Sequence, residues 1–358
     1  MTKSFLRLTT ALLLAIATLY PMATHADAIS DFYKSKQVKL IIGTGVGGGY
    51  DINGRLLARH LARHIPGKPT LVVQNMPGAG SRKAAGYVYK VAPKDGSVMA
   101  QVLNTLPLLQ ALGVTGGGFN VANFQWIGNL SNDVNLVDVW HTAPVKNVGD
   151  ARKTQVILGA TSPGSLSGMI PTVMNNILGT KFKIVTGYKS GTAIDLAVER
   201  GEVQGRAGAA WTVLVKSYPH LIKGKKFVHL AQMGLKRASG LENVPLLTEL
   251  ARNDEERALL EIFSSPAAVG KPTVAAPGVP ADRIRALRAA YDATMKDPKF
   301  LADAERQGLA IGPIDGSDLQ KIVEKTVKAS PALLAKAKTI VAGLNLGKKK
   351  GKKKKKKQ

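Results

Sequence analysis

Glycines at a fixed spacing are the residues of this sequence that most directly suggest chemistry. The stretch IGTGVGGGYDINGR, residues 42–55, places Gly43, Gly45 and Gly48 in the G-x-G-x-x-G spacing that holds the pyrophosphate of a dinucleotide. A dinucleotide site also needs an acidic residue about 20 positions further on, where it binds the ribose hydroxyls. The sequence has no Asp or Glu between Ile52 and Lys94, and no Lys-Ser/Thr pair that would make a P-loop. The pattern therefore argues against a nucleotide enzyme, and we expect no cofactor.

The glycine loop can still bind an anion other than a nucleotide. A glycine loop that enters a helix exposes unpaired backbone N–H groups and the positive end of the helix dipole, which together favour any anion. Residues 34–94 carry eleven Lys and Arg against one acid, Asp51, which we expect to cap the helix. Two further loops, PGAGS at 77–81 and TSPGS at 161–165, also precede expected helices. Together the three loops predict an anion-binding site.

Catalytic alternatives are weaker. His60 and His64 could share a helix face as metal ligands, but the Glu of an H-E-x-x-H motif is absent. The segment GSLSG resembles a nucleophile elbow, yet Ser165 and Ser167 occupy its second and fourth places instead of the third. The chain has no cysteine, which excludes thiolate nucleophiles, thiolate metal sites and disulfides. We expect neither a metal site nor an enzyme.

The N-terminal segment has the features of an export signal. Lys3 and Arg7 precede an apolar run from Leu8 to Tyr20, and small residues follow, ending in Ala-Asp-Ala at 26–28. This order is typical of a secretory signal peptide, residues 1–28, cleaved after Ala26 or Ala28. An uncleaved anchor is the alternative. No later segment has the uninterrupted apolar length of a membrane span, so we expect a soluble protein in the periplasm.

The chain is strongly basic, with a formal net charge of +26. Nine of these charges are lysines in the C-terminal segment 347–358, GKKKGKKKKKKQ. Like-charge repulsion prevents such a run from folding on itself, so a disordered, solvated tail is expected. Contact with an anionic membrane surface is the alternative. Because the chain is expected to be exported and only 5% of its residues are aromatic, we expect no nucleic-acid partner.

The alternation of apolar runs and helical periodicity indicates an α/β fold. Expected strands at 38–42, 70–75 and 98–103 are separated by expected helices at 52–65 and 82–91, which predicts a parallel sheet with its loops opening on one edge. From about Trp140 the same alternation resumes, with expected strands at 155–160 and 227–233. We therefore expect two lobes, with lobe 1 at 29–140, lobe 2 at 141–258 and a return to lobe 1 at 259–346.

Four segments of the chain resemble one protein family. These segments are GVGGGYDINGRLLARHL, VVQNMPGAGSRKAAGYVYKVAPKDG, GTKFKIVTGYKSGTAIDLAVERGEV and VPADRIRALRAAYDATMKDPKF. In order and spacing they are similar to the substrate-binding proteins of tripartite tricarboxylate transporters, also called Bug receptors. The similarity covers about residues 36–340. It implies a type II periplasmic-binding-protein fold, in which two α/β lobes joined by hinge crossovers close around a ligand cleft.

The resemblance also implies which residues bind. In the family, backbone amides of two lobe-1 loops and bridging water hold a small carboxylate, and loops of lobe 2 complete the site. Carried onto this sequence, the first loop supplies Val46, Gly47, Gly48, Gly49, Tyr50 and Asp51, and the second Pro77, Gly78, Ala79, Gly80 and Ser81. The remaining expected ligand-binding residues are Asn104, Thr105, Thr161, Gly164, Ser165, Tyr188, Gly191, Thr192, Asp195, Gly208 and Trp211.

Some positions depart from the family pattern. Gly43 to Val46 replace the usual prolines of the first loop, Ser81 stands where Gly is common, and Gln204 stands where Asp is frequent. A clamp made of backbone amides tolerates such changes, so the carboxylate site is expected to persist. The implied function is a monomeric periplasmic receptor that passes a small carboxylate to the permease subunits of a membrane transporter. A sensor that presents the bound ligand to a signalling partner is the alternative.

Overall fold

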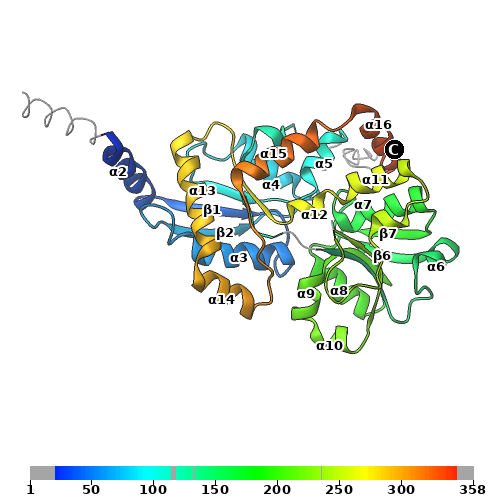
Figure 1. The fold of residues 1–358 in the computed structure, drawn as a ribbon. Coiled ribbons are helices and arrows are strands. Elements are labelled where there is room, and N and C mark those ends of the chain that lie inside the picture. The colour runs from blue at the N-terminus through cyan, green and yellow to red at the C-terminus, as the bar shows by residue number, and fades with distance from the viewer. Residues whose placement is uncertain (1–20, 114–117, 132–133, 235, 345–358) are drawn as a thin grey trace, which may run out of the picture.

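Two sheets, each covered by helices, form the body of the molecule (Figure 1). The structure is a computed structural model that describes residues 21–113, 118–131, 134–234 and 236–344. The apolar run expected to be the core of the signal peptide and the lysine tail lie outside the described residues. Helix α2 (Pro21–Lys34) spans both expected cleavage points. No helix within the described ranges has the length and apolar character needed to cross a membrane.

The first sheet has six strands in the order β11-β4-β10-β3-β1-β2. Strands β1 (Gln37–Ile42), β2 (Thr70–Asn75) and β3 (Val98–Gln101) are parallel, which confirms the predicted unit. Three strands that the sequence reading missed complete the sheet, and their pairings are antiparallel: β4 (Gln125–Asn129), β10 (Pro272–Ala275) and β11 (Ile314–Asp315). The apolar run of β1 is fully buried, as expected for a central strand covered on both faces.

Helices cover both faces of this sheet. On one side lie α3 (Gly49–Leu61), α13 (Ala281–Lys296) and α14 (Pro298–Arg306), and on the other α4 (Arg82–Lys90), α5 (Leu106–Ala111) and α15 (Gly316–Val327) (Figure 1). Helix α3 buries Leu56, Leu57 and Leu61 against the sheet. Its basic face contacts α14, where Arg59 pairs with Asp303 at 3.1 Å.

The second sheet has five strands in the order β7-β6-β8-β5-β9. They are β5 (Asn135–Trp140), β6 (Val156–Ala160), β7 (Phe182–Thr186), β8 (Gly205–Ala210) and β9 (Phe227–Met233). Around them pack α6 (Val148–Lys153), α7 (Leu166–Val173) with its π-helical continuation η2 (Met174–Leu178), α8 (Gly191–Glu199), α9 (Trp211–Ser217) and α10 (Pro219–Lys223). This sheet and its helices form lobe 2.

The chain crosses between the lobes at other positions than the sequence suggested. Strand β5 pairs with β8 and β9, so the first crossing precedes Asn135, not residue 140. Helix α11 (Asp254–Ser264) contacts α7 of lobe 2, and the chain rejoins the first sheet only after α12 (Pro266–Val269), at β10. Strand β5 therefore belongs to the second sheet, although the expected boundary at 140 assigns it to lobe 1. Helix α16 (Pro331–Ile340) then packs on α11.

The two crossings meet at Gly270, which connects α12 to β10. This residue has φ = 52°, and a Cβ atom there would overlap the carbonyl group of Ser131 in the other crossing. We expect Gly270→Ala to lower the free energy of unfolding by about 3 kcal/mol or more, because both the backbone angle and the contact are unfavourable.

Gly179→Ala is the matched control. Gly179 also has a positive φ, 73°, but a Cβ atom there meets nothing within 4 Å. Only the left-handed conformation opposes this variant, which costs about 1 kcal/mol. Chemical denaturation of both variants measures the difference, and equal losses would contradict the crowding at Gly270.

Candidate functional site

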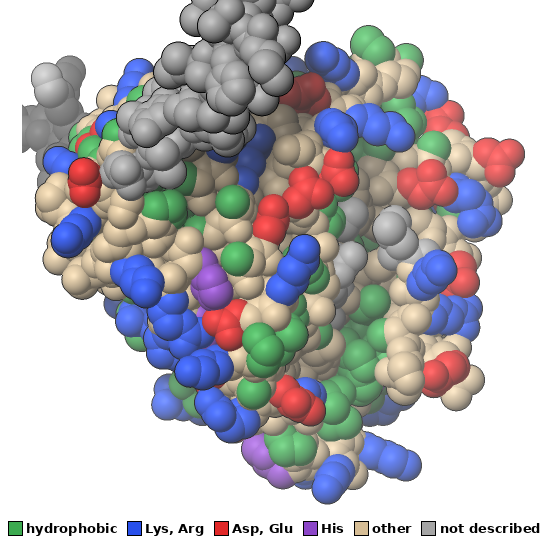
Figure 2. Space-filling view, turned by 60° about the vertical axis from the view of Figure 1, so that its left-hand side comes forward, with side chains coloured by type: hydrophobic (Ala, Val, Ile, Leu, Met, Phe, Trp, Pro, Cys, Tyr) green, Lys and Arg blue, Asp and Glu red, His purple; other side chains and the backbone are tan. Residues whose placement is uncertain are grey.

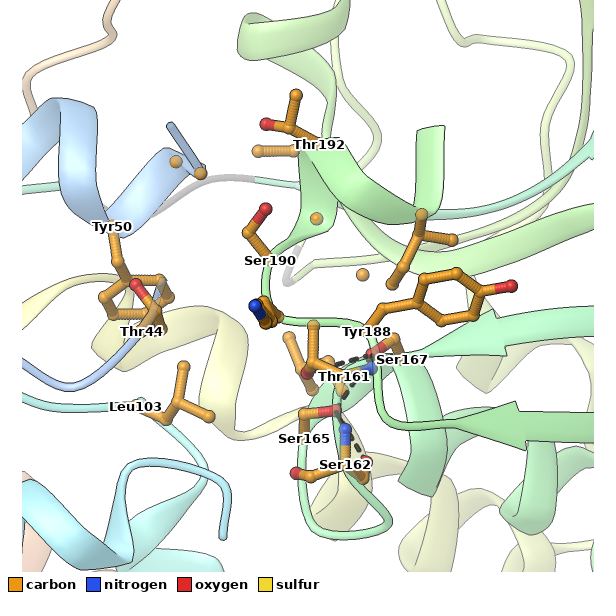
Figure 3. A pocket seen from close by; sticks show the side chains of 18 of the residues that line it. Thr44, Tyr50, Leu103, Thr161, Ser162, Ser165, Ser167, Tyr188, Ser190 and Thr192 are labelled. Carbon is orange, nitrogen blue, oxygen red and sulfur yellow. Dashed lines mark hydrogen bonds between the residues drawn. The ribbon is translucent and has the colours of Figure 1, made fainter. Parts of the chain in front are cut away.

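A cavity of about 350 Å³ lies where the loops of the two lobes meet. Figure 3 shows Thr44, Tyr50 and Leu103 of lobe 1 on one side, facing side chains of lobe 2 on the other. The volume falls within the range of small-molecule pockets. The expected ligand-binding residues that line it are Gly48, Gly49, Tyr50, Pro77, Gly78, Ala79, Gly80, Ser81, Asn104, Thr161, Ser165, Tyr188, Gly191, Thr192, Asp195 and Gly208.

The first glycine loop is fixed by a buried carboxylate. Asp51, 2% exposed, accepts a hydrogen bond from the Gly47 N–H at 2.9 Å and another from Asn75 Nδ2 at 2.8 Å. Arg55 forms an ion pair with the same carboxylate at 3.0 Å. The helix start itself has no side-chain cap, so Asp51 does not cap α3 as expected. Its carboxylate reaches back past the N-cap Gly48 to Gly47 and fixes the loop instead.

The pKa of Asp51 reflects this support. Burial alone would raise it, but the hydrogen bonds from Arg55, Gly47 and Asn75 outweigh burial and hold the pKa below its usual value. The carboxylate is therefore ionised at neutral pH. The buried Asp51 carboxylate fixes the first glycine loop, and Gly48 and Gly49 of this loop line the cavity.

The second loop has an unusual backbone. Gly78, Ala79, Gly80 and Ser81 all have positive φ, at 143°, 48°, 64° and 68°. Non-glycine residues rarely adopt this conformation, and such strain concentrates at functional sites. Successive turns of this kind can present backbone N–H groups to one concave point, which suits an anion. Arg82 donates from Nε to the Ala79 carbonyl at 2.7 Å and helps to hold the loop.

Tyr50 connects the first loop to the crossings. Its hydroxyl donates to the Gly270 carbonyl at 2.9 Å and accepts from the Asn104 N–H at 3.1 Å. Burial raises the pKa of this hydroxyl well above its usual value, so it stays protonated and able to donate. Tyr50 therefore links the cavity lining to Gly270, in the segment that joins the lobes.

Lobe 2 contributes a serine-rich loop before α7. The Ser165 hydroxyl donates to the Ser162 carbonyl at 2.7 Å and lies 2.8 Å from the Ser167 hydroxyl, and Ser167 accepts from the Thr161 N–H at 3.1 Å (Figure 3). These bonds shape the loop and do not form a nucleophile elbow. Three buried cavity-lining atoms have no hydrogen-bond partner within the described chain: Thr44 Oγ1, Ser81 Oγ and Ser162 Oγ. They are available to a ligand or to water.

The lobes touch directly in this structure. The Gly45 N–H donates to the Lys189 carbonyl at 3.2 Å, and Thr192 Oγ1 donates to the Gly47 carbonyl at 2.6 Å. A Cβ atom on Gly48 would lie 3.1 Å from the Ser190 Cβ. The first glycine loop therefore abuts the start of α8.

Charged side chains line the lobe-2 part of the cavity. Arg206 Nε lies 2.9 Å from Asp195 Oδ1, and both side chains are almost fully buried. Burial raises the pKa of Asp195 above its usual value, although the nearby Arg206 charge opposes the shift. Asp195 was expected from the sequence to bind the ligand, whereas Arg206, Lys189 and Lys271, which also line the cavity, were not.

Several expected ligand-binding residues lie outside the lining. They are Val46, Gly47, Asp51, Thr105, Gly164 and Trp211. Val46 is 69% exposed, Gly47 is an exposed residue of the same loop, and the buried Asp51 accepts a hydrogen bond from the Gly47 N–H. The Trp211 indole N–H donates to the Ser239 carbonyl, and its ring packs on His229.

The possible metal ligands are engaged elsewhere. His60 Nε2 lies 2.9 Å from Asp303, and His64 Nε2 lies 2.8 Å from Asp297. In the parts of the chain that the structure describes, no group of three or more His, Cys, Asp or Glu side chains could hold a metal ion. His60 holds α3 against α14, and His64, which follows α3, binds Asp297, the N-cap residue of α14.

Removing the charge beneath the first loop tests its role. We expect Asp51→Asn to lower the free energy of unfolding by about 1–2 kcal/mol at neutral pH, since Arg55 is partly exposed and solvent screens part of the ion pair. Because the folded pKa lies below the usual 3.8, this contribution is present above that value and is lost as pH falls through the folded pKa.

Chemical denaturation at pH values from about 7 to about 3 checks this dependence. The difference between wild type and Asp51→Asn should narrow as the pH falls below about 4. Asp318→Asn, which removes an exposed first-turn carboxylate from α15, is the control and should have the smaller effect at neutral pH. A difference that is constant with pH would argue against the ionised Asp51.

Known proteins share sequence and fold with this chain. No family model matches the chain. The UPF0065 protein in gbd 5'region of Cupriavidus necator is 30% identical over 244 residues, which cover 66% of this chain and 71% of that protein.

Solved structures share the fold. The periplasmic binding protein BugD aligns with a TM-score of 0.69 at 20% identity, over 87% of this chain and 98% of that one. R. palustris Rpa4515 with adipate aligns with a TM-score of 0.67 at 22% identity, over 86% and 98%. The likeness confirms the expected fold of two α/β lobes around a cleft. By its match to the curated relative, this chain belongs to the UPF0065 family, the family of the Bug periplasmic binding proteins.

Proposed function

We propose that the protein is a periplasmic receptor that binds a small organic carboxylate between its lobes and delivers it to a tripartite tricarboxylate-type transporter. The observation that carries this proposal is the pair of lobe-1 loops at the cavity, of which the second has four successive residues with positive φ. Backbone N–H groups in such loops suit an anion. The adipate bound by one structural neighbour supports the same ligand class.

The binding mechanism follows from the two-lobed shape. In the open form, lobe 1 offers the amide loops to the carboxylate. Closure brings the Ser162 hydroxyl and the start of α8 over the ligand, so that fixed protein dipoles replace water around the charge. Each hydrogen bond to the ionised carboxylate contributes roughly 1.5–3 kcal/mol. The ligand leaves chemically unchanged.

Export and delivery belong to the same proposal. The segment 1–28 directs the chain to the periplasm and is removed there, and the mature monomer then meets the permease subunits. Figure 2 shows Lys and Arg side chains distributed over the visible face, so the basic character extends beyond the lysine tail. This charge favours an approach to an anionic membrane surface, which the tail strengthens. No observation in the described chain favours the signalling alternative.

A bulky side chain in the first glycine loop tests the proposed carboxylate site. Gly48→Leu places a side chain between the loop and Ser190, and we expect it to weaken adipate binding at least about 100-fold, which is roughly 2.7 kcal/mol or one to two charge-assisted hydrogen bonds. Isothermal titration calorimetry on the mature chain measures the loss.

Val46→Leu is the matched control, because Val46 lies in the same loop but is 69% exposed. Its affinity should equal that of the wild type. Gly48→Leu with unchanged affinity would rule out the amide loops as the anion site. Native mass spectrometry of the freshly purified protein identifies the ligand that it carries from the cell.

A further inference from the structure

The surface of α9 and α10 carries an unbalanced set of charges. Lys216, Lys223, Lys225 and Lys226 lie in these helices or in the turn that follows them, and residues 203–241 contain no Asp or Glu. The first three are exposed and Lys226 is partly exposed. In the described chain, none of the four forms an ion pair with a carboxylate. We call these four residues the lysine face, which lies at the lower end of lobe 2 in Figure 1.

Acidic side chains of the neighbouring helix do not cancel this charge. From α8, Asp195 and Glu199 lie close enough to Tyr218, between α9 and α10, to influence the pKa of its hydroxyl. Asp195 is buried in its pair with Arg206, so its charge is already compensated. Glu199 is exposed and has no such pair in the described chain. One exposed carboxylate of α8 therefore opposes four lysines.

The turn after α10 holds one of these lysines in a strained conformation. Lys225 has φ = 48°, in the left-handed region that residues with a Cβ atom rarely adopt. The preceding Gly224 would adopt this region without strain, yet its φ is −77°. Hydrogen bonds from the Lys225 N–H to the Ile222 carbonyl and from the Lys226 N–H to the Leu221 carbonyl fix the turn. Strain of this kind concentrates at functional sites.

Lys216 places the lysine face beside the cleft between the lobes. A Cβ atom on Gly308, which follows α14 in lobe 1, would overlap the Lys216 side chain, so the stem of this lysine packs on lobe 1. The next two residues, Ser217 and Tyr218, line the ligand cavity. One short segment therefore borders the cavity and also presents cations to the surface.

The composition of the face suits a lipid surface better than a folded acidic protein. All four cations are lysines, whereas protein interfaces are enriched in arginine and depleted in lysine. Lysine is a flexible point charge that needs no partner of fixed geometry. Val215, next to Lys216 on α9, is 37% exposed. Lysines beside an exposed apolar side chain are typical of segments that bind at a membrane interface.

We propose, resting on the receptor function above, that the lysine face binds anionic phospholipid and holds the ligand cavity beside the membrane that contains the permease. The lipid phosphates attract the four ammonium groups, and no shaped pocket is needed. This contact is separate from the lysine tail. Helix α16, which precedes the tail, lies at the upper end of lobe 2 in Figure 1, and α10 lies at the lower end.

Vesicle sedimentation tests the contact. The mature wild-type chain should bind phosphatidylcholine vesicles that contain about 30% phosphatidylglycerol, and should not bind phosphatidylcholine alone. High salt should weaken the binding because it screens the attraction. Replacing Lys216, Lys223, Lys225 and Lys226 together by Gln should weaken the partitioning at least about tenfold.

A second quadruple variant separates the face from net charge. Lys90, Lys94, Lys325 and Lys328 are exposed lysines of lobe 1, and replacing these four by Gln removes the same total charge. This control should weaken the partitioning by less than about twofold, since these lysines lie away from the proposed contact. Thermal melts verify that both variants are folded, and both should keep the wild-type affinity for adipate.

Lysine acetylation read by mass spectrometry locates the contact without interference from the tail. The anionic vesicles should protect Lys216, Lys223 and Lys225 from acetylation and leave Lys90 and Lys325 reactive. Protection is expected because a lysine held at the lipid headgroups is less accessible to the reagent.

The outcomes separate this proposal from the receptor function. Equal losses in the two quadruple variants would overturn the lysine face, and so would a face that stays fully reactive with vesicles present, which would favour an acidic protein as its partner. Adipate titration without vesicles tests the receptor function on its own. A wild type that binds vesicles through the face but binds no carboxylate would remove the receptor function and leave the membrane contact standing.

Discussion

The hydrogen bond from the Gly47 N–H to the buried carboxylate of Asp51 is the constraint on which the cleft depends. It fixes the first glycine loop against α3, and the same carboxylate binds Asn75 at the end of β2. The carboxyl ends of β1 and β2 are thereby joined, and the two loops that follow these strands share one edge of the sheet. The loop that Asp51 orders is also the one that touches Ser190 and Thr192 of lobe 2. Ligand site and lobe contact therefore depend on one buried charge.

Local features of the fold could be predicted from the sequence. The apolar run of β1, the glycines after it and the helical spacing of α3 are neighbours in the chain, and strand, loop and helix form where these patterns indicate. The loop PGAGS is similar, since its glycines and its position before α4 mark a turn at a helix start. Hydrophobic periodicity and turn-forming residues are properties of short segments, so they can be recognised in a single sequence.

Residues that depend on distant pairing could not be predicted in this way. Arg206 lies in a segment whose pattern predicts only a short strand, and the pairing of β8 with β5 places Asp138 opposite it. The pairing of β5 with β9 then places His229 opposite Asp138. Lys271 lies in a segment for which the sequence predicts only the return of the chain from lobe 2 to lobe 1. Trp211 was expected at the ligand, but α9 begins at this residue and directs its ring to His229. The direction of a side chain at a helix start is set by tertiary packing, which no local pattern encodes.

Two hydrogen bonds between the lobes involve only backbone atoms and one threonine hydroxyl. Gly45 bonds to the Lys189 carbonyl and Thr192 bonds to the Gly47 carbonyl, and neither bond needs a ligand atom. These two bonds therefore help to hold the lobes together without a ligand atom. Any motion that separates the lobes must break both bonds, and it would expose the first glycine loop to water.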